Sequence, residues 1–448
     1  MRLTPFRTAV SAAVLFGLGL ACAPLIAQET AELPAKPRTA DEIYSDLSLF
    51  GEVFDRIRAE YVEAPDEKKL IHAALRGMLT SLDPHSDYME PIDYADVQED
   101  TTGQFGGLGI EVQMEEGAIK VVSPIDDTPA AKAGILAGDF IVELDGAPVQ
   151  GLSLDEAVAK MRGQVGTKIE ITVVREGVDQ PLDFELTRDI IATRAARLTM
   201  QGEIAVIRLA RFSEQAFPGI KKSIDDAYTQ LGHAPKGFVL DLRNNPGGLV
   251  DQAVYVSDAF LPQGSVVLTR GRLETESSRY DARPDALDQK IADVPLVVLI
   301  NGGSASASEI VAGALQDHKR ATVLGTRSFG KGSVQTIIPL GAGNGALRLT
   351  TARYYTPAGR SIQAKGISPD IEVLQDVPEE LKARADTKGE SALRGHLKAD
   401  GEEQTGSQSY IPPDPKDDKA LKMAADLLRG TVTNSAFPPT GKRAGLPK

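Results

Sequence analysis

Three loops rich in glycine and serine, set among short apolar runs, constrain the fold of this 448-residue chain most strongly. The apolar runs have the length of buried strands, and helical periodicity appears between them. Strands that alternate with helices predict an α/β core with a mainly parallel sheet, whose active site lies at the carboxyl ends of the strands. The predicted strands are Ile204–Leu209, Phe238–Leu242, Val294–Ile300, Thr322–Gly325 and Ser333–Pro339, and the predicted helices are Leu249–Phe260 and Ser306–Gln316.

The first loop, Asp241-Leu-Arg-Asn-Asn-Pro-Gly247-Gly248, directly follows the apolar residues that begin at Phe238. Adjacent glycines let backbone amides point outward without obstruction by side chains. Such amides can stabilise a developing oxyanion. On its own, however, this loop is also explained as a simple strand-to-helix turn capped by Asp241.

The second loop contains the run Ser304-Ala-Ser306-Ala-Ser308-Glu309 and begins the predicted helix. A serine at a helix start lies in the positive end of the helix dipole, which suits a nucleophile that passes through an anionic intermediate. Ser306-x-x-Glu309 is also a capping box, in which the hydroxyl and the carboxylate satisfy free amides at the helix start. Both interpretations of Ser306 remain open at this point.

The third loop is Phe329-Gly-Lys331-Gly-Ser-Val-Gln335. On an extended strand, residues four apart share a face, so Lys331 and Gln335 are expected to point the same way. A buried lysine with a lowered pKa can act as a general base, whereas a surface lysine beside a glycine loop has no such role. The glycine spacing does not match a phosphate-binding Walker motif.

Other catalytic chemistries find less support in the sequence. His318 is twelve residues beyond Ser306, which on one helix places it ~18 Å away. His85, in the turn Leu82-Asp-Pro-His-Ser, is expected to be structural. There is no His-Glu-x-x-His motif, and the single cysteine, Cys22, excludes an internal disulfide and a zinc cluster. We expect no metal and no cofactor.

Residues 103–188 form a β-rich module of their own. A short helix is predicted at Pro129–Ala133, and a longer one at Ser153–Met161, where Ser153 and Glu156 make a capping box. The predicted strands are Gly109–Met114, Ile119–Val122, Phe140–Leu144, Lys168–Arg175 and Asp183–Thr187.

The two ends of the chain differ from its centre. Arg2 and Arg7 precede the uncharged stretch Thr8–Ala27, which is typical of a secretory signal, with an uncleaved membrane anchor as the alternative. We expect residues 28–40 to be a linker and 41–102 to be a helical region with helices on both sides of Pro65. Residues 376–448 are predicted to contain a polar segment that over 379–415 is either a linker or disordered, then a short helix at 417–429 and a loose tail.

Taken together and in this order, the three loops, the turn Leu82-Asp-Pro-His-Ser and the 103–188 module strongly resemble the carboxyl-terminal processing proteases, also called tail-specific proteases. The resemblance covers 41–375 and the short helix near 417–429. It implies a Ser–Lys dyad, with Ser306 as the nucleophile, Lys331 as the base and Gln335 as the residue that orients the lysine. The oxyanion hole would then consist of the Ala307 amide and that of Gly247 or Gly248.

By the same resemblance, residues 103–188 are a PDZ domain and 189–375 the protease core. The peptide-binding loop of the PDZ domain would be Gly106-Gly107-Leu108-Gly109-Ile110. The helix Leu154–Met161 would form the other wall of the binding groove, and the carboxylate at the end of a substrate chain would bind in this groove. The expected function is an exported serine endopeptidase, in the periplasm or at the outer face of the inner membrane. It would cleave proteins near accessible C-terminal tails. An exported PDZ scaffold that binds tails without cleavage is the alternative.

Partners other than substrates are less constrained. The net charge of −14, or −16 once residues 1–27 and their two arginines are removed, gives no electrostatic footprint for nucleic acid. Apolar stripes in 41–82 and 417–429 are candidate surfaces for a homo-oligomer or an adaptor. The uncharged N-terminal stretch is a possible membrane tether.

Overall fold

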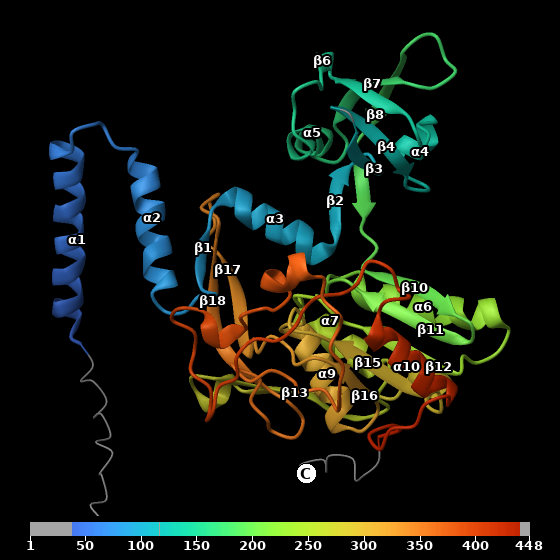
Figure 1. Ribbon diagram of the computed structural model, residues 1–448. Coiled ribbons are helices and arrows are strands. Elements are labelled where there is room, and N and C mark those ends of the chain that lie inside the picture. The colour runs from blue at the N-terminus through green and yellow to red at the C-terminus, as the bar shows by residue number, and fades with distance from the viewer. Residues whose placement is uncertain (1–37, 116, 440–448) are drawn as a thin grey trace, which may run out of the picture. The chain divides into compact units, whose positions relative to one another are not determined.

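The computed structural model describes residues 38–115 and 117–439 (Figure 1). The predicted signal or anchor at 1–27 and nearly all of the 28–40 linker lie outside the described residues. The chain divides into two compact units, one ending at Glu67 and one beginning at Lys68. Within the described part of the chain, no helix combines the length and the apolar character needed to cross a membrane.

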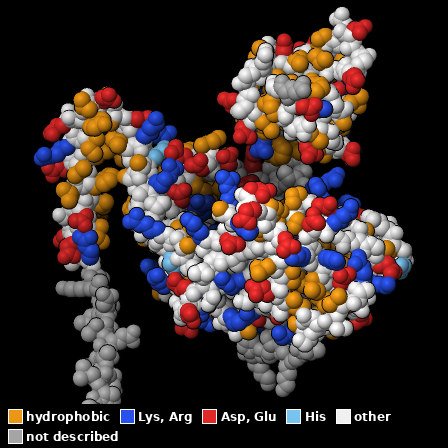
Figure 2. Space-filling view, in the orientation of Figure 1, with side chains coloured by type: hydrophobic (Ala, Val, Ile, Leu, Met, Phe, Trp, Pro, Cys, Tyr) orange, Lys and Arg blue, Asp and Glu red, His pale blue; other side chains and the backbone are white. Residues whose placement is uncertain are grey.

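The first unit is a helical arm. Its helix α1 (Ala40–Glu60) begins with a capping box at Thr39 and contains no buried residue. Large apolar side chains, including Leu47, Leu49 and Phe50, are exposed along it, and Figure 2 shows hydrophobic side chains gathered on this helix. The predicted apolar stripe of the arm is therefore uncovered within the described residues of this unit.

The second unit opens with α2 (Glu67–Thr80), β1 (Asp87–Met89) and α3 (Pro91–Thr102). The PDZ module follows. Its antiparallel sheet has the order β3-β4-β5-β7-β8, with β6 beside β5, and its core contains fully buried side chains such as Ile119 and Ile171. Its elements are β3 (Ile110–Glu115), β4 (Ala118–Pro124), α4 (Pro129–Ala133), β5 (Phe140–Leu144), β6 (Ala147–Pro148), α5 (Leu154–Met161), β7 (Lys168–Val174) and β8 (Leu182–Thr187).

A pair of antiparallel strands, β2 (Gln104–Gly107) and β9 (Asp189–Ala192), flanks the PDZ module at its two ends. The segments by which the chain enters and leaves the module therefore lie side by side. Ser153 caps α5 with the predicted box, in which its hydroxyl accepts from the Glu156 amide and the Glu156 carboxylate accepts from the Ser153 amide.

The protease core is built on a six-stranded sheet with the order β10-β11-β12-β15-β16-β19. All of its pairings are parallel except β10–β11. Its strands are β10 (Ala196–Gln201), β11 (Ile204–Leu209), β12 (Gly237–Asp241), β15 (Leu296–Ile300), β16 (Thr322–Gly325) and β19 (Ile371–Glu372).

Helices cover both faces of this sheet, because alternate residues of each strand point to opposite sides. Phe238 and Leu240 pack with α6 (Ala216–Leu231), α7 (Val250–Asp258) and α9 (Ala307–Asp317). Val239, between them, packs with the C-terminal helix α10 (Lys419–Arg429). The apolar stripe of α10 is thus buried against the sheet, so the expectation that the 417–429 helix offers an assembly surface is wrong.

A second sheet of the core is entirely antiparallel, with the order β1-β18-β13-β14 and β17 beside β18. The expectation of a mainly parallel core is therefore not confirmed, because the core combines this sheet with a largely parallel one. Its remaining elements are β13 (Gly264–Gly271), η1 (Glu274–Glu276), β14 (Ser278–Ala282), α8 (Ala286–Ile291), β17 (Ser333–Pro339) and β18 (Ala346–Tyr355).

The polar segment before α10 is folded, and the prediction of a linker or of disorder over 379–415 is wrong. It contains the short helices η2 (Glu379–Arg384) and η3 (Glu390–Ala392), and the Glu390 side chain is buried. The segment is held by hydrogen bonds from its backbone and polar side chains to the core, for example from the Glu390 amide to the Phe329 carbonyl. Composition alone does not reveal such bonds, because they depend on partners far away in the chain.

Candidate active site

Ser306 lies at the start of α9, in the loop that follows β15. It has φ 55° and ψ −114°, a left-handed backbone that costs a non-glycine residue on the order of 1–3 kcal/mol. The outer serines of the run are tied to the neighbouring loop: Ser304 Oγ donates to the Leu242 carbonyl and Ser308 Oγ to the Asn245 carbonyl, both at 2.9 Å. The Ser306 hydroxyl makes no capping hydrogen bond. Of the three serines, only the middle one thus has a hydroxyl that is not tied to the neighbouring loop.

Glu309 connects the serine loop to the lysine loop. Its Oε2 accepts the Ser306 amide at 2.8 Å and the Lys331 amide at 2.9 Å. Its Oε1 accepts Ser328 Oγ at 2.6 Å and the Gly330 amide at 2.7 Å. Only the carboxylate half of the predicted capping box is formed, and the same carboxylate also binds a loop more than twenty residues further along the chain.

The environment of Glu309 is fully buried. Burial raises the pKa of this carboxyl to about 7, although the four hydrogen bonds that it accepts act in the opposite direction. A buried group with this many donors fixes its surroundings, because each donor would otherwise be unpaired. The backbone amides of Ser306 and Lys331 are therefore both fixed by one oxygen atom, Glu309 Oε2.

Lys331 is partly buried, and burial lowers the pKa of its amine. The charge of Glu390 is the largest opposing influence and raises that pKa, whereas Arg348 lowers it. Glu309 and Asp83 also raise it, by smaller amounts. Among the described residues the amine has no hydrogen-bond or ion-pair partner. Its pKa is thus set by burial and by charges around it rather than by a single salt bridge.

Gln335 does not follow the predicted geometry. The chain becomes strand β17 only at Ser333, and the register with β18 shifts between Val334 and Gln335. Such an irregularity interrupts the alternation of side chains, so the expectation that Lys331 and Gln335 share a face of one regular strand is wrong. Gln335 Nε2 donates instead to Ser333 Oγ at 2.9 Å and to Thr350 Oγ1 at 3.1 Å.

The bonds of Gln335 lead to the turn before β1. Thr350 Oγ1 donates to Asp83 Oδ1 at 3.1 Å, and Ser86 Oγ donates to Asp83 Oδ2 at 2.7 Å. Burial raises the pKa of Asp83, but hydrogen bonds from Ser86, Thr350 and the His85 amide outweigh burial and hold it below its ordinary value. Asp83 is therefore an ionised carboxylate beside the lysine site.

Sequence reasoning missed a buried cluster around Glu390. His85 Nε2 lies 2.9 Å from Glu390 Oε2, and Gln363 Nε2 donates to Glu390 Oε1 at 3.0 Å. Gln363 Oε1 in turn accepts the amide of Gly332, the residue after Lys331, at 3.0 Å. Glu390 lies in the segment predicted to be a linker or disordered and 305 residues after His85, so no local pattern could have linked them.

Tyr354 on β18 was also missed, and it borders the serine. Its side chain is buried, which raises the pKa of the phenol, and the Ser306 hydroxyl is its hydrogen-bonding neighbour. His318, by contrast, follows α9, and its Nε2 lies 2.7 Å from the Ser265 carbonyl. No group of three or more metal-ligating side chains occurs among the described residues.

The glycines of the first loop lie against the start of α9. A Cβ on Gly247, which has φ +99°, would come within 2.8 Å of Ser306 Cβ and 2.9 Å of the Ala307 nitrogen. The Gly247 amide already donates to Asn245 Oδ1 at 2.9 Å. The amides of Gly248 and Ala307 have no protein acceptor within the described residues. The two unpaired donors thus belong to Ala307, which follows the serine, and to Gly248, which follows the glycine that lies against it.

The PDZ module carries the expected groove between its glycine loop and α5. A hollow of about 150 Å³ is lined by Gly107, Leu108, Gly109 and Ile110 on one side and by residues of α5 such as Val158 on the other. Gly106 is the one predicted loop residue that does not line this hollow; it lies in β2, and its carbonyl accepts the Gly163 amide at 3.1 Å. Gly106 therefore belongs to the strand that enters the module.

Known proteins match the chain in all three regions. Family models match residues 203–373 (peptidase family S41), 106–186 (PDZ domain) and 9–91 (activating protease CtpB N-terminal domain). A carboxy-terminal-processing protease of Bartonella bacilliformis is 56% identical over 400 residues, which are 88% of this chain and 91% of the relative. The chain belongs to the carboxy-terminal-processing proteases of family S41. It is therefore a protease with a PDZ domain.

Two more distant proteins also match the chain. A carboxyl-terminal-processing protease of Synechocystis is 36% identical over 367 residues, covering 80% of this chain and 84% of the relative. Among solved structures, the photosystem II D1 C-terminal processing protease is 30% identical and covers 75% of this chain and 94% of that one, with a TM-score of 0.41.

Proposed function

We propose that this carboxy-terminal-processing protease is a serine endopeptidase with Ser306 as nucleophile and Lys331 as general base. The observation that carries the proposal is the Glu309 carboxylate, which binds the amides of both residues while the Ser306 hydroxyl stays free of capping. The lowered pKa of Lys331, caused by burial, favours the neutral amine that a general base requires.

In this mechanism the neutral Lys331 amine takes the proton of Ser306 Oγ while the oxygen attacks a substrate carbonyl. The amide of Ala307 and that of Gly248 stabilise the oxyanion, because neither has a protein acceptor, whereas the Gly247 amide already bonds Asn245. The lysine then passes the proton to the leaving amine. Water, deprotonated by Lys331, hydrolyses the acyl-enzyme. Gln335 acts through Thr350 and Asp83, whose carboxylate faces the lysine.

The position of cleavage and the site of action are part of the same proposal. The PDZ groove between Leu108 and Val158 receives the C-terminal tail of a protein substrate, with the chain added as a strand beside β3, the edge of its sheet. Residues 1–27 export the protein to the periplasm or the outer face of the inner membrane, as a signal or as a tether. The exposed apolar side chains of α1 form the contact surface for a second copy of the chain in a homo-oligomer, or for an adaptor protein.

The test compares cleavage of a model tail peptide by the wild type and by three variants. Ser306→Ala and Lys331→Ala should abolish cleavage. Ser308→Ala is the matched control, because its hydroxyl already bonds the Asn245 carbonyl and should not be needed for chemistry. Equal cleavage by the wild type and Ser306→Ala would refute the assignment.

A second measurement separates the protease from a scaffold that only binds tails. A serine-reactive phosphonate probe should label Ser306 in the wild type and not in Lys331→Ala. Tail binding without labelling would favour the scaffold.

A further inference from the structure

Strand β10 leaves one edge of the core sheet open. It is the first strand in the sheet order, and its only strand partner among the described residues is β11. An edge strand presents a row of unpaired amide and carbonyl groups, which natural proteins usually cover or interrupt. The open edge of β10 therefore requires an explanation.

The register of β10 and β11 identifies the open groups. The Ala210 amide donates to the Ala195 carbonyl at 2.9 Å, and Arg197 and Thr199 occupy equivalent positions two and four residues later. Because hydrogen-bonded and open positions alternate in an antiparallel pair, Leu198 and its neighbours at even positions direct their amides and carbonyls away from β11. Three consecutive even residues, Ala196, Leu198 and Met200, thus form the free edge.

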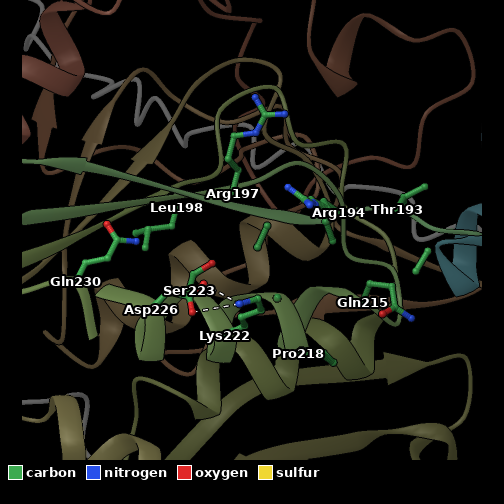
Figure 3. A pocket seen from close by; sticks show the side chains of 14 residues that line it. Thr193, Arg194, Arg197, Leu198, Gln215, Pro218, Lys222, Ser223, Asp226 and Gln230 are labelled. Carbon is green, nitrogen blue, oxygen red and sulfur yellow. Dashed lines mark hydrogen bonds and ion pairs between the residues drawn. The ribbon is translucent and has the colours of Figure 1, made fainter. Parts of the chain in front are cut away.

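A groove runs along this edge between β10 and α6. It has a volume of about 600 Å³, within the range of ordinary ligand sites. Its walls include Ala196 and Leu198 from the strand and Lys222 from the helix (Figure 3). The strand and the helix approach closely at Gly219, where a Cβ would come within 2.9 Å of Ala196 Cβ. The free edge therefore has open space in front of it and a wall beside it.

The groove carries positive charge on an acidic protein. Neither the guanidinium of Arg194 nor that of Arg197 has a hydrogen-bond or ion-pair partner among the residues that the structure describes. The only carboxylate of the lining, Asp226, is already paired with Lys222 at 2.9 Å, as the dashed lines of Figure 3 show. With a net charge of −14 over the whole chain, two uncompensated arginines on one groove are a local exception.

We propose that this groove binds an extended, acidic segment of a protein, which adds to β10 as a further antiparallel or parallel strand. The free amides and carbonyls of Ala196, Leu198 and Met200 would pair with its backbone. Its apolar side chains would lie beside the half-buried Leu198, and its carboxylates would lie beside Arg194 and Arg197. This site is separate from the PDZ groove and does not depend on the assignment of the dyad.

The test uses the full chain with Ser306→Ala, which prevents cleavage, and a peptide of alternating glutamate and valine with both ends blocked. Blocked ends exclude recognition of a chain-end carboxylate. We expect the peptide to bind, with an affinity that falls as salt increases, and the corresponding lysine–valine peptide not to bind. Arg197→Glu should weaken binding at least tenfold. Arg279→Glu is the matched control, because Arg279 lies on the edge strand β14 and is paired with Asp281 at 2.7 Å.

Strand addition makes a second, register-specific prediction. Leu198→Pro removes an outward-facing amide and leaves the bonds to β11 intact, so it should also weaken binding at least tenfold. In the protein without this substitution, bound peptide should slow hydrogen exchange at Leu198 and not at Thr199, whose amide already bonds β11. This exchange measurement tests the proposal even if Leu198→Pro does not fold.

Three outcomes would overturn the proposal. One is absence of peptide binding at millimolar concentration, and another is binding that Arg197→Glu leaves unchanged. The third is binding of phosphatidylglycerol vesicles that Arg197→Glu abolishes, together with acidic-peptide binding that produces no protection at Leu198. That result would indicate a general anionic surface without strand addition.

Discussion

Replacement of Glu309 by glutamine tests the electrostatics of the residue that holds the serine and lysine loops together. Burial raises the pKa of this carboxyl from 4.5 to about 7 in the folded protein. This difference in pKa corresponds to about 3 kcal/mol. Because the folded protein binds this proton more tightly than the unfolded chain, the stabilisation is complete below pH 4.5 and is lost as the pH rises through 7.

Glutamine cannot bind this proton, so the pH-dependent part of the stability disappears in the variant. The unfolding free energy of the wild type minus that of Glu309→Gln should therefore decrease by about 3 kcal/mol between pH 4.5 and pH 8. For a domain of about 150–250 residues, this change in free energy alters the gap between the two melting temperatures by roughly 6–12 °C. Thermal melts of both proteins across this pH range measure it, and effects common to both proteins cancel.

A second, pH-independent effect of Glu309→Gln follows from its hydrogen bonds. Each carboxylate oxygen accepts from two donors, and the glutamine oxygen can replace only one of them. The side-chain nitrogen of the glutamine then faces two donors that have lost their acceptor. Each unpaired donor lowers the unfolding free energy by roughly 1–3 kcal/mol. Cleavage should fall as well, because the positions of the serine and lysine loops are no longer coupled.

The pH dependence of the stability difference decides whether this reasoning holds. A difference that stays constant, or that grows with pH, would refute it, because the four donors would then stabilise the carboxylate more than burial destabilises it. Glu403→Gln is a control of opposite sign. Hydrogen bonds from the Ala399 amide and from His396 lower the pKa of Glu403, so its stabilising effect increases with pH.

Three further substitutions test other parts of the site. Glu390→Gln should move the rise of kcat/KM with pH to lower pH, because it removes the strongest carboxylate influence on the general base, whereas Glu403→Gln should leave the pH–rate profile unchanged. Asp418→Ala should lower the unfolding free energy by roughly 1–3 kcal/mol in urea, since it removes an acceptor 2.8 Å from the buried Arg243, which keeps its pair with Asp241, and also removes the side-chain cap of α10. Gly247→Ala should abolish cleavage in a protein that still folds, because the new methyl group meets the serine loop; retained activity would contradict that packing.

Much of the fold could be predicted because its signals are local. The strands β11, β16 and β17 and the helix α4 have the predicted bounds, and β12 and β15 differ from prediction by only one or two residues. The helix α6 was not predicted, because Pro218 and Gly219 in its first turn weaken the helical pattern. The strands β10, β14 and β18 were also missed, since partially exposed strands lack a continuous apolar run, and the largely buried β13 was missed because its apolar run is only three residues long, Val266–Leu268.

For the candidate site, too, one part could be predicted from the sequence and another part could not. The order of the three loops was sufficient to indicate a resemblance to the carboxyl-terminal processing proteases, and it was this resemblance that singled out Ser306 and Lys331, because each loop taken alone left a purely structural interpretation open. The choice between Gly247 and Gly248 was not accessible, because it depends on the direction of an amide toward Asn245.

By itself, the sequence determined many of the strands and helices, the three loops of the candidate site and the family that the chain resembles. Only the tertiary structure decided how those loops are held: by Glu309 across two loops, and by Glu390 from a polar segment that composition assigned to a linker or to disorder. The tertiary structure also revealed the open, basic edge of β10. The physical reason is that local propensity depends on neighbours in sequence. Burial, charge and hydrogen-bond pairing depend instead on residues that meet only when the chain is folded.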